Sequence, residues 1–156
     1  PIDYVDETWI TTYLSLMADL KYGPTSEFQK KLLDEQIIIE PIEFFTVYTK
    51  THVALVISAE SKKVDTFINK VINEMSNNNI LESDFIRKRK TLVASTIFAS
   101  DNIYRINSKI VSNMIRHGSV ITDDYEKCKN LSFDILKRII SDIEYSNIAT
   151  VVVEPK

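Results

Sequence analysis

Cysteine and glycine are scarce in this 156-residue chain, which has one Cys and two Gly. Cys128 has no second cysteine to pair with, so an internal disulfide is excluded and a reducing compartment is favoured over a secreted fold. Gly23 and Gly118 lie too far apart to build a phosphate-binding loop, a dinucleotide fingerprint or a Gly-x-Ser-x-Gly elbow. The shortage of glycine therefore removes three common kinds of enzyme site.

Histidine is equally rare, because His52 and His117 are the only two. Neither has a second His three or four residues away, so the chain has no His-Glu-x-x-His and no His-x-x-Glu-His. We expect no zinc site made from this chain alone. The ordinary interpretation is that His52 opens a strand and His117 neutralises a helix C-terminus. A Cys128 nucleophile would need a nearby His, and a single Cys is more often inert, although the flanking Lys127 and Lys129 would lower its pKa if it were exposed.

The chain also lacks an excess of positive charge and any apolar run near the roughly 20 residues that span a bilayer. Its 19 Lys and Arg face 22 Asp and Glu, for a formal net charge of −3. One basic run occupies positions 87–90, but on a helix its side chains point in four directions, and Glu82 and Asp84 dilute its charge. We expect a solvated helix with ion pairs, no nucleic-acid partner and no membrane partner. Residues 1–4 form no basic and apolar leader, so we expect no signal peptide and a cytoplasmic protein.

The overall composition is that of an ordinary soluble protein, with 44% hydrophobic and 26% charged residues. The length suits one sizeable core, and we predict a single domain over residues 1–156, cut from a longer protein as its C-terminal part. The acidic pairs at 34–35 and 123–124 lie beside helix ends, where acids favour helix N-termini or solvent. The sequence therefore assigns no catalytic residue, no metal ligand and no substrate-binding residue.

The first half of the chain predicts two helices and a hairpin. Asp6 is a plausible N-cap for a helix that buries Trp9, Tyr13, Leu16, Met17 and Leu20 and ends at Gly23-Pro24. Thr25 or Ser26 caps a short second helix. Residues 37–49, with a bend at Pro41, and residues 52–59 predict two antiparallel strands joined by the short link 49–51. Both faces of the second strand are apolar, so we expect cover on both sides.

The second half predicts five helices and a last strand. We expect these helices at 64–75, from Ser83, from Ser100-Asp101 to Gly118, at 123–129 and from Ser132, and we expect the strand at 147–153. In the helix from Ser83 we expect six side chains to face inward: Phe85, Ile86, Leu92, Val93, Thr96 and Ile97. The resulting order predicts an α+β fold with helices packed on one face of a mainly antiparallel sheet. Three strands make a small sheet for this length, so we expect the fold's first strands to be missing upstream of Pro1.

Several segments together resemble the pitrilysin/insulinase (inverzincin) zinc metallopeptidases. In that family a helix ends in a small-residue turn, and Ser and a bulky residue then open a helix that ends in an acidic residue. Gly23, Ser26, Phe28, Leu32 and Glu35 hold those places within the stretch YLSLMADLKYGPTSEFQKKLLDE. The resemblance continues through the strand pair at 43–59, the helix at 64–75, the acidic and then basic helix start at 82–88 and the helix at 101–117. It covers about residues 13–154 and looks most like a C-terminal-half domain of the bacterial processing-protease branch.

The resemblance implies a domain without catalytic chemistry. In that family one half carries His-x-x-Glu-His and a distal Glu for zinc, and the other half keeps the fold and closes a chamber around the peptide. This chain has neither the metal motif nor a match to the Arg and Tyr with which some members hold substrate, so no family residue is carried over. We expect an inactive chain that supports peptide hydrolysis by a catalytic half or homologous subunit, with zinc only in that partner.

Two alternatives stay open at this point. The chain could be a stand-alone interaction module, or an inactive family member, that binds a partner through its sheet, because edge strands offer unpaired N–H and C=O groups. A truncated sheet would also favour self-association by strand exchange.

Overall fold

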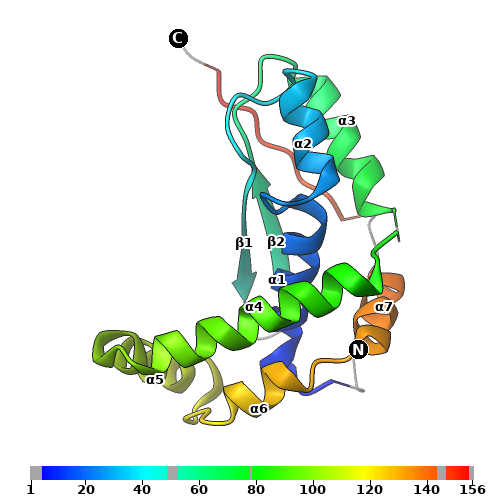
Figure 1. Cartoon of the computed structure of the whole chain (residues 1–156). Coiled ribbons are helices and arrows are strands. Elements are labelled where there is room, and N and C mark those ends of the chain that lie inside the picture. Colours follow the sequence, from blue (N-terminus) through cyan, green and yellow to red (C-terminus); the bar gives the residue numbers. More distant parts are fainter. Residues whose placement is uncertain (1–4, 49–52, 78, 144–146, 155–156) are drawn as a thin grey trace. The chain divides into compact units, whose positions relative to one another are not determined.

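The computed structural model describes residues 5–48, 53–77, 79–143 and 147–154 (Figure 1). The chain divides into two compact units, Pro1–Ile80 with Leu136–Lys156, and Leu81–Ile135, and each is described by itself. The elements of the described residues are α1 (Glu7–Tyr22), α2 (Glu27–Asp34), β1 (Glu43–Tyr48), β2 (Val53–Ser58), α3 (Val64–Met75), α4 (Glu82–Ser100), α5 (Ile103–His117), α6 (Asp124–Lys129) and α7 (Phe133–Asp142). The α+β class is confirmed, and the prediction of a single domain stays a prediction.

The ends of α1 and α2 follow the predicted capping residues. Asp6 accepts a hydrogen bond from the Thr8 backbone N–H at 2.9 Å, and Ser26 accepts one from the Gln29 N–H at 3.2 Å. Gly23 ends α1 in an extended conformation, not the left-handed one typical of helix-ending glycines. A Cβ at Gly23 would lie 2.3 Å from the Asp19 carbonyl oxygen, so glycine is needed there for close approach.

Strands β1 and β2 form an antiparallel hairpin that places Phe44 opposite Ile57. These two side chains pack against the core of this unit, and α1 contacts both strands. On the opposite face Phe45 and Val47 are 54% and 44% exposed. On this face of β2 Ala54 is exposed and Val56 is half-buried, so the expected cover on both sides of β2 is only partial, while the prediction of helices on one face is confirmed (Figure 1).

The core of this unit gathers buried side chains from the two first helices, the segment before β1 and α3. They are Ala18, Tyr22, Leu32, Ile37, Ile38, Ile42 and Val71. Tyr22 contacts Phe28 edge to face, with ring centroids 5.7 Å apart. The predicted α1 stripe is confirmed at its first four positions, since Trp9, Tyr13, Leu16 and Met17 are all buried.

Lys21 is buried in the same unit, where its ammonium group caps α3. Its Nζ donates to the backbone carbonyls of Glu74 at 3.0 Å, Met75 at 2.8 Å and Asn77 at 2.7 Å. These oxygens lie at the C-terminal end of α3, where helical carbonyls lack partners and the dipole favours a cation. Burial lowers the pKa of Lys21, and the nearby Glu74 carboxylate partly opposes this.

In the second unit α4 packs against α6 and reaches α5 at its C-terminal end (Figure 1). Phe85 is buried and contacts Phe133, with ring centroids 5.3 Å apart. The expectation that Ile86 and Ile97 face inward is wrong, because they are 36% and 50% exposed. Helix α5 ends at Gly118, whose φ of 67° is the left-handed conformation that glycine tolerates without strain.

Three sequence predictions need correction. Residues 147–153 form no strand, and Val151 and Val153 are 85% and 89% exposed, because β-branched side chains make a strand only where a neighbouring strand pairs with the backbone. Strand β1 begins at Glu43, and the segment before it makes a single bridge between Ile38 and Ser61. Helix α4 begins before Ser83, at Glu82, without a side-chain cap.

The predicted cap of α5 is wrong and that of α7 is confirmed. Asn102, not Ser100 or Asp101, caps α5 by accepting from the N–H groups of Tyr104 and Arg105. Ser132 accepts from the Ile135 N–H at 3.4 Å, as expected for the start of α7. The link 49–51 and His52 lie outside the described residues.

Candidate interaction surface

Metal binding needs several donor side chains held close together. In the parts of the chain that the structure describes, no group of three or more His, Cys, Asp or Glu side chains is placed to hold a metal ion. His117 is the last residue of α5. The described residues therefore do not fit a zinc ion.

Cys128 lies in α6 and is 3% exposed. Burial raises the pKa of its thiol, and Lys109 offsets this only in part. The two flanking lysines do not produce a thiolate, because the side chain is covered and burial disfavours the charged form. This environment is that of an inert, buried cysteine.

The basic run at 87–90 has structural contacts of its own. Arg87 pairs with Asp84 at 3.0 Å. Arg89 donates to the Leu131 carbonyl at 2.8 Å, and its guanidinium lies over the Phe85 ring, 5.5 Å from the centroid. The run therefore spreads over several directions and joins α4 to its own unit, as the helical geometry predicts.

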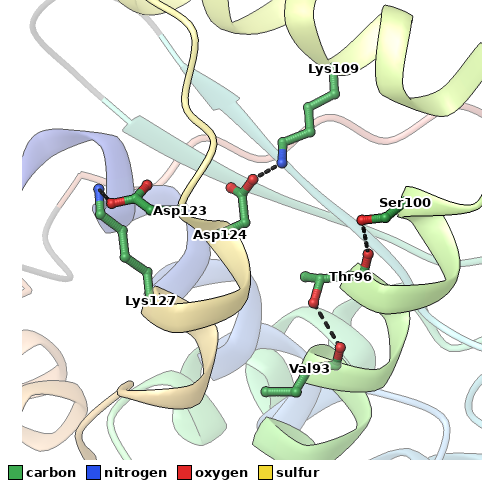
Figure 2. Close-up of polar contacts among 7 residues, drawn as sticks. All are labelled: Val93, Thr96, Ser100, Lys109, Asp123, Asp124 and Lys127. Atoms are coloured by element: carbon green, nitrogen blue, oxygen red, sulfur yellow. Dashed lines mark hydrogen bonds and ion pairs between the residues drawn. The ribbon is translucent and has the colours of Figure 1, made fainter. Parts of the chain in front are cut away.

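The acidic pairs also make local ion pairs. Glu35 accepts from Lys70 at 2.8 Å, and this hydrogen bond, with the Lys70 charge, lowers the pKa of Glu35. Asp123 lies 3.4 Å from the Lys127 ammonium, and Asp124 pairs with Lys109 of α5 (Figure 2). Each of these carboxylates faces a lysine, and neither adjacent pair is arranged as a general acid with a general base.

A shallow hollow of about 400 Å³ lies between α2 and α3. Its charged walls are Lys31, Lys70 and Glu74, and its apolar walls are Phe28 and Leu32. It has charges of both signs and no nucleophile, so it offers no feature that selects a ligand.

The most unusual surface of the molecule is the outward side of α5. We name it the α5 apolar face: Ile103, Tyr104, Ile106, Ile110, Val111, Met114 and Ile115. Each of these side chains is at least 38% exposed, and Ile103, Tyr104 and Ile115 reach 75%, 82% and 79%. At about 100° per residue these positions cover roughly half of the helix circumference. Soluble monomers rarely expose a contiguous apolar patch of this kind without a function for it.

Two polar side chains of α5 lie toward its own unit. Lys109 pairs with Asp124 of α6 (Figure 2), and the Asn113 amide nitrogen is buried. An ordinary surface helix buries its apolar stripe and exposes its polar one. Helix α5 leaves its apolar stripe exposed, and Arg105, Asn107 and Ser108 are exposed as well.

The C-terminal half of α4 also exposes apolar side chains and carries no charge. Residues 91–100 contain no charged side chain, and Ile97 and Phe98 are 50% and 71% exposed. The hydroxyl groups there bond to their own helix: Thr96 donates to the Val93 carbonyl at 2.7 Å and Ser100 to the Thr96 carbonyl at 2.9 Å (Figure 2). The polar atoms of this segment are therefore satisfied locally, and its outward surface is apolar.

Sequence reasoning found the helix but missed the surface. The apolar spacing of Ile103, Ile106, Ile110 and Met114 predicts an amphipathic helix, and amphipathicity by itself suggests a buried stripe. The absence of any acidic residue in α5, beside Arg105, Lys109 and Arg116, was the one signal that could have suggested an exposed, partner-binding helix.

Comparisons with known proteins agree with this picture at the level of fold. No family model and no curated protein matches the chain. One similar solved structure is the crystal structure of a protein described as an M16-like peptidase, from Alicyclobacillus acidocaldarius. The two structures superpose with a TM-score of 0.76 at 17% sequence identity, over 85% of this chain and 32% of that one. M16 is the pitrilysin/insulinase family.

The likeness shows the fold of the chain and how much of the M16-like protein this chain matches. This chain spans about a third of the length of that M16-like protein and has the fold of that third. In the described residues no helix is long and apolar enough to cross a membrane. The chain thus has an M16-like α+β fold, with no metal centre among its described residues and with a large apolar helix face exposed.

Proposed function

We propose that this chain is a non-catalytic domain of a zinc metallopeptidase-like protein, one that helps to enclose the peptide substrate. In this proposal a partner half, or a homologous subunit, carries His-x-x-Glu-His and the zinc ion. This chain supplies a wall of the chamber, which admits unfolded peptides, excludes large folded proteins and removes water around the scissile bond on closure. The lone, buried Cys128 suits the cytoplasm, where we place this action.

One observation carries the proposal. The chain matches a third of an M16-like protein over most of its own length, while its sequence has no zinc motif. A fold kept without its metal ligands is expected of a structural domain that works beside a catalytic one.

The open face of the hairpin supports a second function, which is binding of a partner without any peptidase. Phe45 and Val47 are exposed there, and β1 and β2 pair only with each other among the described residues. Either strand could accept an extended segment. An inactive M16-like relative would use such a surface with no zinc-bearing half.

Reconstitution separates the two functions. The catalytic half is identified as the M16-like polypeptide with His-x-x-Glu-His encoded in the same gene or beside it, and is purified with zinc. Hydrolysis of a quenched fluorescent peptide is then measured with each component alone and with both together. The proposal predicts no hydrolysis by this chain alone and a large gain when the two are mixed. Equal hydrolysis by the catalytic half alone would contradict it, as would the lack of any such half.

A further inference from the structure

We draw no further inference here: the strongest candidate, the α5 apolar face of the second unit, is at least 38% exposed at every position, and nothing in the structure shows what covers it.

Discussion

Replacing Lys21 by Met tests the least expected contact of the fold. Lys21 lies in the last turn of α1 and is 4% exposed, yet its ammonium group reaches three carbonyls at the end of α3. Methionine keeps the length and the apolar stem of the side chain and removes the charge and all three hydrogen bonds. The end of α3 then loses its cap, while the cost of burying a charge disappears.

The balance of these effects sets the expected magnitude. A hydrogen bond to a charged group contributes about 1.5–3 kcal/mol, and a cation at a helix C-terminus adds up to about 2 kcal/mol. Two changes reduce the loss: the ammonium no longer has to be desolvated, and water reaches some of the freed carbonyls. We therefore expect Lys21→Met to lower the free energy of unfolding by about 2 kcal/mol.

The assay is urea unfolding at neutral pH, followed by the fluorescence of Trp9. Trp9 is the only tryptophan of the chain, and it is buried in α1, so it reports on the unit that contains Lys21. Lys30→Met on the exposed surface of α2 is the matched control and should change stability by less than about 0.5 kcal/mol. A Lys21→Met loss no larger than that of the control would refute the capping argument.

Three further predictions concern an ion pair, the buried cysteine and the two glycines. The pKa of Glu35 is lowered chiefly by its hydrogen bond from Lys70, so this pair stabilises the fold at pH values above the ordinary glutamate pKa, and the stabilisation is lost as pH falls through the folded-state pKa. In an NMR titration Lys70→Ala should raise the pKa of Glu35. An unchanged pKa would contradict the interaction. Burial and the raised pKa of Cys128 predict that a disulfide reagent labels it at least roughly 100-fold more slowly in the folded chain than in urea, whereas equal rates would indicate an accessible thiol. Gly118→Ala should lower the free energy of unfolding by about 1 kcal/mol, because φ at this position is 67°, and hydrogen exchange in the last turn of α5 should become faster. Gly23→Ala should lower it more, because the added Cβ would meet the Asp19 carbonyl. A smaller loss for Gly23→Ala than for Gly118→Ala would contradict this reasoning.

Local sequence signals located most of the elements because those elements depend on neighbouring residues. The side chains of Asp6 and Ser26 accept N–H groups two or three residues along the chain, so their helix starts follow from sequence alone. The stripe from Trp9 to Met17 is buried as its spacing predicts. The helix at 64–75 has the predicted bounds.

Apart from the caps of α4 and α5, the failures depend on distant partners. Residues 147–153 have strand composition but no strand beside them in the described structure, and pairing is a property of two segments. Lysine is ordinarily a surface residue, and the capping role of Lys21 depends on α3, more than fifty residues away. The direction in which α5 points its apolar side is set by how it packs, which spacing cannot reveal. The candidate surface was therefore beyond sequence reasoning, although the helix was not.

The central claim is that this chain belongs beside a zinc-bearing half, and the coding sequence on both sides of the 156 codons tests it most directly. The account predicts a further M16-like domain there, or in an adjacent gene, with His-x-x-Glu-His and a distal Glu. Related domains without that motif would contradict the peptidase role and favour an inactive relative that binds a partner. A start codon directly before Pro1 with no M16-like neighbour would contradict the account as a whole.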